Sequence, residues 1–198
     1  MNGKTKVALT IVVVLTCALL ASAGSLSGTV KSDSSGASIV YLEPANGVAP
    51  VAVSEKQYVI TQQGMKFMPQ VVAVTPGSTV VFRNDDAAAH NVSWPSVGGD
   101  KKLAHNLGTF PKGQQRSYKF DHPGIVPLLC TVHPEMEGYI IVSPTPYYGQ
   151  AEPILGMYQI ANVPDGQYKV TAWHAGKKSA SKVVAVAGAV KVDFDLTR

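Results

Sequence analysis

Short runs of β-branched and aromatic residues, separated by turn residues, recur along most of the chain after residue 24. Such residues favour extended strands, and no stretch sustains a helical period beyond about two turns. Turn signals stand at Pro76-Gly77, Pro111-Lys112-Gly113, Pro123-Gly124 and Pro164-Asp165-Gly166. This pattern predicts an all-β chain built from sandwiches of antiparallel sheets. The predicted strands are Leu26–Lys31, Ser38–Leu42, Gln57–Thr61, Val71–Thr75, Thr79–Asn84, Gln115–Phe120, Gly124–Leu129, Gly138–Val142, Met157–Ile160, Gln167–Trp173, Ala180–Ala187 and Val190–Asp195.

The first 23 residues have the pattern of an export signal. Lys4 and Lys6 form a positive end, residues 7–20 are apolar or small, and Ala21-Ser22-Ala23 is an A-x-A cleavage site. The apolar run is shorter than the roughly 20 residues that a membrane-spanning helix needs. We therefore expect a cleaved signal peptide and an exported protein, periplasmic or extracellular, with no stable membrane span. Retention of the segment as a membrane anchor is the alternative.

Charge and cysteine content narrow the function classes. The net charge is +4, and Lys4 and Lys6 of the expected signal contribute two of those charges. No cluster of five Lys or Arg residues exists, so we expect no nucleic-acid partner. Once Cys17 leaves with the signal, Cys130 is the single cysteine, and no intramolecular disulfide can form. A lone thiol in an oxidising compartment needs burial or metal ligation to avoid oxidation.

A cluster of soft metal ligands surrounds that cysteine. Cys130, His133 and Met136 fall at Cys-x2-His-x2-Met, so one tight loop can present all three to one ion. His90 follows a predicted strand and turn upstream and is placed to supply a fourth ligand. A thiolate, two imidazoles and a weak axial thioether are the ligand set of a type 1, or blue, copper centre. We therefore predict one copper ion bound by His90, Cys130, His133 and Met136.

Several other residues could in principle bind the metal, and Cys130 itself has an alternative role. Cys130 as an inert buried cysteine is the alternative to metal ligation, and Glu135 is a competing oxygen donor that we expect to face solvent. We expect His105 and His122 not to bind the metal and His174 to be structural. Met65 and Met68 are expected to pack a first strand rather than to bind copper.

The surroundings of the centre follow from neighbouring residues. Asn91 and Thr131 each follow a ligand and can hydrogen-bond across the two ligand segments. The apolar residues before Cys130 are expected to wall the thiolate, and they are Ile125, Val126, Leu128 and Leu129. An apolar docking patch is expected around His133, made of Pro134, Pro95, Val97 and Pro127.

Two seams with the composition of linkers divide the chain, one at residues 43–50 and the other at Ser143-Pro144-Thr145-Pro146. The pieces outside them are too small to form stable cores alone, so we expect them to fold together. The predicted organisation is a signal peptide at 1–23, a discontinuous sandwich at 24–50 and 145–198, and a copper domain at 51–144.

The segment from Gln57 to Val142 resembles the cupredoxin family, especially amicyanin and pseudoazurin-like members. The motifs that carry the resemblance are residues 65–71, 76–86, His90-Asn91-Val92, Tyr118-Lys119-Phe120 and the Cys130–Met136 loop, whose two-residue gap between His133 and Met136 is similar to amicyanin. The resemblance implies a Greek-key β-sandwich with type 1 copper on His90, Cys130, His133 and Met136.

The flanks resemble a second family, the carboxypeptidase regulatory-like or transthyretin-like sandwich. The resemblance is carried by residues 26–30, 37–42 and 160–170. It implies a small β-sandwich that the copper domain interrupts.

The leading function hypothesis is an exported one-electron carrier that exchanges electrons with a redox partner protein. A copper-binding or delivery protein without redox cycling is the main alternative, and an adhesion or scaffold module is a third. An enzyme is not expected, because copper oxidases and nitrite reductases need a second copper site with several more histidines. After His90 and His133, three scattered histidines remain.

Overall fold

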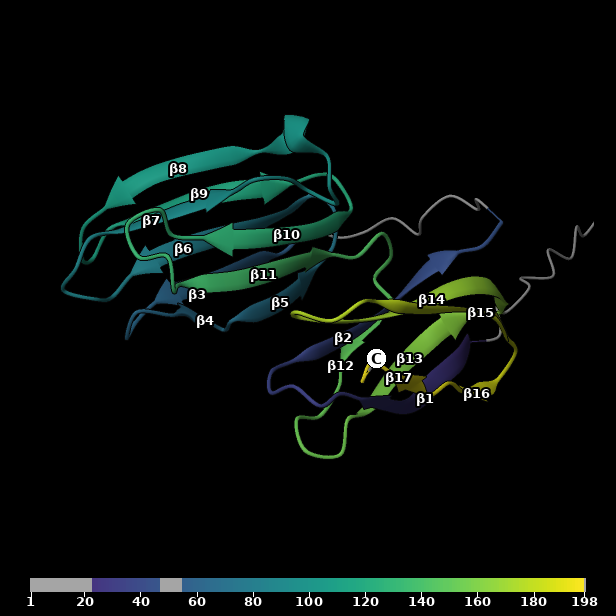
Figure 1. Ribbon diagram of the computed structural model, residues 1–198. Coiled ribbons are helices and arrows are strands. Elements are labelled where there is room, and N and C mark those ends of the chain that lie inside the picture. The colour runs from purple at the N-terminus through teal and green to yellow at the C-terminus, as the bar shows by residue number, and fades with distance from the viewer. Residues whose placement is uncertain (1–22, 47–54, 198) are drawn as a thin grey trace, which may run out of the picture.

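A computed structural model of the chain describes residues 23–46 and 55–197, and this part consists almost entirely of strands and their connections (Figure 1). Its one helical element is the short 3-10 helix η1 (Lys101–Leu103). The predicted all-β class is therefore confirmed. No helix in this described part is long and apolar enough to cross a membrane. Most of the expected signal and part of the first seam lie outside the described residues.

The first sandwich packs a five-stranded sheet against a four-stranded sheet. Strand order is β5-β11-β10-β7-β8 in one sheet and β4-β3-β6-β9 in the other. Their facing side chains form one core, with Ile60, Phe82 and Phe120 from the smaller sheet and Val126 and Ile140 from the larger. The strands are β3 (Gln57–Gln62), β4 (Phe67–Met68), β5 (Val71–Val74), β6 (Ser78–Asn84), β7 (His90–Trp94), β8 (His105–Phe110), β9 (Gln115–Phe120), β10 (Gly124–Leu129) and β11 (Glu137–Val142).

The second sandwich combines strands that precede the first sandwich in the sequence with strands that follow it. One sheet has the order β13-β1-β16, with β17 also on β1, and the other has the order β12-β2-β14-β15. Because β1 pairs with β13 and β2 with β14, the expected pairing of the flanking segments is confirmed. The domain boundaries stay a prediction. The strands are β1 (Ala23–Lys31), β2 (Ser38–Pro44), β12 (Tyr148–Gln150), β13 (Met157–Pro164), β14 (Gly166–His174), β15 (Ala180–Val186), β16 (Ala189–Lys191) and β17 (Phe194–Asp195).

The seam at residues 143–146 connects the two sandwiches and is largely buried. Ser143 and Thr145 are almost completely buried. Ser143 Oγ donates to the carbonyl of Thr145, and Thr145 Oγ1 donates to the carbonyl of Leu42, each at 2.7 Å. These bonds satisfy buried polar groups and fix the connection in place. The segment therefore connects the two sandwiches with the Thr145 hydroxyl anchored to β2, and the domain boundary expected there stays a prediction.

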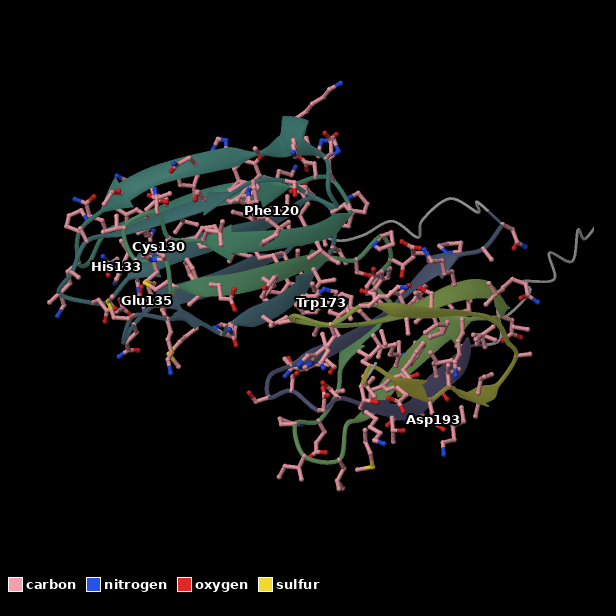
Figure 2. All side chains as sticks on the ribbon, in the orientation of Figure 1. Phe120, Cys130, His133, Glu135, Trp173 and Asp193 are labelled. Atoms are coloured by element: carbon pink, nitrogen blue, oxygen red, sulfur yellow. The ribbon has the colours of Figure 1, made fainter. Side chains whose placement is uncertain are left out.

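A small apolar cluster joins the two sandwiches. It contains Val71 and Ile141 from the first sandwich and Ile39 and Trp173 from the second. The rings of Tyr139 and Trp173 have centroids 5.0 Å apart. Figure 2 labels Trp173 close to the strands that Figure 1 labels β5 and β11. The two cores therefore meet through packed side chains.

Candidate metal centre

Two neighbouring antiparallel strands bring His90 and Cys130 to the same end of the first sandwich. Side chains alternate across a strand, so His90 shares the inward face of β7 with Val92 and Trp94. Cys130 continues the inward face of β10 after Val126 and Leu128. Because β7 runs antiparallel to β10, the start of one strand lies beside the end of the other.

The loop from Cys130 to Met136 is closed by its own backbone. The N–H of Met136 donates to the carbonyl of His133 at 3.0 Å, and the N–H of Cys130 donates to the carbonyl of Met136 at 3.3 Å. The loop then enters β11, which pairs with β10 from Leu129–Glu137 onward. This tight connection turns His133 back toward Cys130, and it leaves Met136 buried beneath the loop at 1% exposure.

Three donor atoms converge at this end of the first sandwich, where Figure 2 labels Cys130 and His133. One ligand atom from each of His90, Cys130 and His133 lies within 4.8 Å of the others. The Nδ1 atoms of His90 and His133 are 2.9 Å apart, and His133 Nδ1 is 3.8 Å from Cys130 Sγ. Bonds from metal ions to imidazole nitrogen and thiolate sulfur are about 2.0–2.3 Å. The separations therefore suit donors that share one ion, and the soft donor set fits copper.

Asp86 fixes the orientation of the His90 ring. Its Oδ2 accepts a hydrogen bond from His90 Nε2 at 2.8 Å, which places the ring proton on Nε2 and the lone pair on Nδ1, toward Cys130 and His133. The main-chain N–H groups of Met65 and Gly64 also donate to this carboxylate. These N–H groups, Met65 first, and the His90 imidazole hold the pKa of Asp86 below its usual range.

Asn91 links the two ligand segments. Its main-chain N–H donates to Cys130 Sγ at 3.4 Å, and its Oδ1 accepts from the N–H of Thr131 at 3.3 Å. The expected hydrogen bonding of Asn91 and Thr131 across the ligand segments is thus confirmed. Asn91 Nδ2 donates to Asn106 Oδ1 at 2.8 Å, which ties the pair to β8. Together these bonds hold the His90 and Cys130 segments in register.

The apolar wall of the centre is narrower than expected. Val126 and Leu128 are fully buried in the core below Cys130. Leu129 is 40% exposed, and Ile125 packs in the cluster between the sandwiches. Strand alternation explains the difference, since residues adjacent in β10 face opposite sides of the sheet.

The other histidines lie away from the centre, as expected. His105 is exposed and its ring stacks on Trp94 and Tyr118. His122 is exposed in the turn before β10. His174 is buried in the second sandwich, where its Nδ1 bonds Ser38 Oγ at 2.9 Å.

Glu135, Met65 and Met68 are the remaining residues that could have been metal ligands. Glu135 is exposed, as expected of a residue that faces solvent. Met65 packs against the core of the first sandwich, but Met68 is 49% exposed. The packing role expected of Met68 is therefore wrong, because neighbouring Phe67 takes the inward position of the two-residue strand β4.

The expected docking patch is partly wrong. Val97 is buried at 6% exposure, and the N–H of the adjacent Gly98 donates to the carbonyl of Ile125. Val97 therefore lies beside the start of β10, whereas Cys130 follows its end. Pro134 is exposed beside half-buried His133, and the sequence prediction missed Val132, which is 47% exposed in the same loop.

Two polar residues near the centre were not predicted as part of it. Asp86 stands four residues before His90, a spacing that allows a carboxylate at a turn to reach the imidazole. Gln62 is buried and donates from Nε2 to the main-chain oxygen of Asn91 at 3.1 Å. No local signal marks Gln62, because its partner lies in the opposite sheet.

Comparisons with known proteins concern the first sandwich. The model of the family described as copper binding proteins, plastocyanin/azurin family, matches residues 54–143. Amicyanin-alpha of Methylorubrum extorquens is 36% identical over 78 residues, which are 39% of this chain and 65%, just under two thirds, of that protein. Amicyanin of Paracoccus versutus is 29% identical over 96 residues, which are 48% of this chain and 71% of that protein. A solved copper(I) form of an amicyanin variant is 30% identical, with a TM-score of 0.40, and the match covers 52% of this chain and 92% of that structure.

Proposed function

Because residues 54–143 form a cupredoxin domain of the plastocyanin/azurin family of copper-binding proteins, we propose that this protein is a one-electron carrier. Its cofactor is copper, and we propose His90, Cys130, His133 and Met136 as the ligands of a single type 1 ion. The observation that carries the proposal is the convergence of the His90, His133 and Cys130 donor atoms within 4.8 Å. Copper in such a ligand set takes up and releases one electron between Cu(II) and Cu(I).

The protein supplies a rigid and dry surrounding for these ligands. Asp86 holds His90 in the tautomer that turns Nδ1 inward, and Asn91 donates an N–H to the sulfur of Cys130. His90, Cys130 and Met136 are each at most 3% exposed, so the protein excludes water from three of the four proposed ligands. Ligands held this firmly need little rearrangement when the charge of the centre changes.

The surface above His133 is the proposed contact with a redox partner protein. His133 is half-buried, so part of its ring reaches the surface, and exposed Val132 and Pro134 flank it in the chain. Figure 2 places this loop at the end of the first sandwich away from Trp173 and the second sandwich. Transient redox complexes use small interfaces, typically under about 1,200 Å². A few apolar residues around His133 are therefore sufficient for brief docking.

We propose further that the chain is exported to the periplasm or the extracellular space and is not an enzyme. The first proposal rests on the signal pattern at residues 1–23. The second rests on the described histidines outside the centre, His105, His122 and His174, which form no further metal-ligating group with the described acidic residues.

Copper titration of the chain without residues 1–23 tests the proposal. Addition of Cu(II) is expected to produce an intense visible thiolate-to-copper band that saturates at one ion per chain. Cys130→Ser is expected to abolish the band and preserve the far-ultraviolet dichroism, because the change removes the ligand and little volume. A second equivalent of copper, or saturation without a visible band, contradicts the type 1 assignment.

Redox cycling separates a carrier from a delivery protein. The loaded protein is reduced and reoxidised repeatedly in the presence of a competing chelator. A carrier is expected to regain its full visible band in each cycle and to lose no copper. Rapid transfer of copper to the chelator on reduction contradicts the carrier proposal and favours delivery.

A further inference from the structure

A buried glutamine lies beside the residues of the metal centre. Gln62 is fully buried at the end of β3, in a sandwich whose core is otherwise largely apolar. Its Nε2 donates to the main-chain oxygen of Asn91 at 3.1 Å. Its Oε1 has no hydrogen-bond partner within the described residues. The carbonyl acceptor fixes the orientation of the amide, since a flipped amide would place two oxygens against each other.

This hydrogen bond joins the two sheets of the sandwich at Asn91, the residue that follows the proposed ligand His90. Gln62 belongs to the sheet β4-β3-β6-β9, whereas Asn91 belongs to the sheet that contains β7 and β10. The ladder between β7 and β8 shifts register between Asn91 and Ser93, so the strand pairing is irregular there. The Gln62 amide therefore supports the backbone of Asn91 from the opposite sheet.

Asn91 transmits this support to the thiolate. The two peptide units that flank its Cα carry one bond each, the N–H to Cys130 Sγ and the carbonyl to Gln62. A rotation about the backbone of Asn91 that weakens one bond also moves the other group. Gln62 thereby restrains the direction of the N–H that reaches the sulfur.

We propose that Gln62 is a positioning residue that sets the reduction potential of the centre through the Asn91 N–H···Sγ hydrogen bond. The inference rests on the proposed function, since it requires copper on Cys130. Hydrogen bonds to a ligating sulfur withdraw negative charge from it and favour the reduced metal. Loss of the restraint weakens the bond and lowers the reduction potential.

Stability alone does not explain a glutamine at this position. An unpaired buried oxygen destabilises the folded state, and an apolar side chain of similar volume carries no such oxygen. The one hydrogen bond that Gln62 Nε2 makes is directed at the residue that contacts the thiolate. The polar group is thus placed where it affects the metal rather than where it best stabilises the core.

The test compares Gln62→Met with Ile60→Met. Both changes place the same unbranched side chain on the inward face of β3, but only the first removes the donor to Asn91. The measurements on the copper-loaded full chain are the reduction potential and the chemical shift of the Asn91 amide proton in the diamagnetic Cu(I) form. Gln62→Met is expected to lower the potential and shift that proton upfield, while the visible band and one-copper stoichiometry persist. Ile60→Met is expected to change neither and to reduce thermal stability.

Two outcomes overturn the inference in distinguishable ways. An unchanged potential and an unchanged Asn91 amide shift in Gln62→Met, with the band intact, refute the role of Gln62 and leave the carrier proposal standing. A wild-type protein without a thiolate-to-copper band refutes both. If Gln62→Met does not fold, Gln62→Leu is measured in the same way, with the same expected shifts.

Discussion

At the residue scale, Asp86 joins a strained turn to the metal centre. Met65 has a φ of 58°, a left-handed conformation that is uncommon for a residue other than glycine. The N–H groups of Gly64 and Met65 donate to the Asp86 carboxylate at 2.7 and 3.0 Å. The same carboxylate accepts from His90 Nε2. One side chain therefore stabilises the turn before β4 and the orientation of a proposed ligand.

Asp86→Asn is expected to weaken both functions. An amide is uncharged and offers one acceptor oxygen where the carboxylate offers two. At least one of the three donors, Gly64, Met65 or His90, therefore loses its acceptor, and the others bond a neutral oxygen. Replacement of a hydrogen-bond partner behind a metal-bound histidine typically reduces metal affinity about 10–100-fold. The free energy of unfolding of the copper-free chain is expected to fall by about 1–2 kcal/mol. Chelator competition and urea denaturation measure the two effects.

Asp85→Asn is the matched control. Asp85 adjoins Asp86, but its carboxylate pairs with the exposed Arg83 guanidinium rather than with the centre. Surface pairs of this kind contribute little to stability, so copper affinity is expected to stay unchanged. Equal losses of affinity in the two variants would show that the general negative charge matters and not the bond to His90.

At the element scale, β1 passes so close to the end of the chain that glycine is required. A Cβ atom at Gly28 would lie 1.9 Å from the main-chain oxygen of Val192 and 2.6 Å from its carbonyl carbon. Gly28→Ala is expected to force β1 away from the connection between β16 and β17 and to destabilise the fold by at least about 2 kcal/mol. Gly166→Ala is the control, because its Cβ would meet the Tyr168 ring at 3.4 Å, an ordinary contact. Thermal melts of equal midpoint for the two variants would contradict this reading.

Asp193 makes the same junction sensitive to acid. Its Oδ1 accepts from Thr29 Oγ1 and the Thr29 N–H at 2.9 and 2.8 Å. The Thr29 hydroxyl, then its N–H, and the charge of nearby Lys191 lower the pKa of Asp193. A carboxyl whose folded pKa is below its unfolded value of about 3.9 stabilises the fold above that pH. This contribution disappears as the pH falls through the folded pKa.

Asp193→Asn is expected to be less stable than the wild type at pH 7, and the difference is expected to shrink as the pH falls below about 4. Denaturant unfolding at a series of pH values measures it. A difference that stays constant down to pH 2 would show that the Asp193 charge is not responsible.

The strands that sequence patterns predict are those rich in apolar, β-branched or aromatic residues and bounded by turn residues. β9 and β10 have the predicted bounds, and β6 differs by one residue. β7 and β8 were not predicted, because His90-Asn91 and His105-Asn106 place polar residues where a half-buried strand usually has apolar ones. The predicted strand Val190–Asp195 divides into β16 and β17, since the main-chain ladder with β1 is interrupted at Val192 and Asp193, where the Thr29 N–H donates to the Asp193 side chain.

The residues of the candidate site also differ in whether the sequence alone predicts them. Cys130, His133 and Met136 are near neighbours in sequence, so their spacing alone predicts that they can share an ion. Asp86 and Gln62 act through hydrogen bonds that only the folded sandwich creates, Gln62 across its two sheets. Sequence reasoning therefore finds ligands more readily than the residues that orient them.

At the scale of the whole molecule, the proposed copper loop and the second sandwich occupy opposite ends of the first sandwich (Figure 2). The cupredoxin resemblance is confirmed for the first sandwich. The resemblance of the flanks to carboxypeptidase regulatory-like domains stays a prediction, as do the domain boundaries. The arrangement leaves the surface around His133 free of the second sandwich, so a partner can approach the loop directly.

The contact between the sandwiches is expected to couple their unfolding. Trp173 is 5% exposed and packs on Tyr139 of β11, near Ile39 and Ile141 of the same cluster. A hydrogen bond between the hydroxyls of Tyr58 and Tyr148, 3.2 Å long, adds a second link. Cooperative unfolding of two bodies requires that their interface contribute substantially to the stability of each.

Trp173→Ala is expected to reduce that coupling without altering the metal centre. Truncation of a buried tryptophan costs about 3–5 kcal/mol, and the loss falls on β14 of the second sandwich and on the shared interface. The visible copper band reports the first sandwich, and far-ultraviolet dichroism reports all strands. In the wild type we expect both signals to disappear in one transition on heating. In Trp173→Ala we expect part of the dichroism to be lost at lower temperature than the band, while Trp173→Phe, which keeps a ring against Tyr139, stays closer to the wild type. Coincident transitions in the alanine variant would show that the two sandwiches are coupled by contacts other than this cluster.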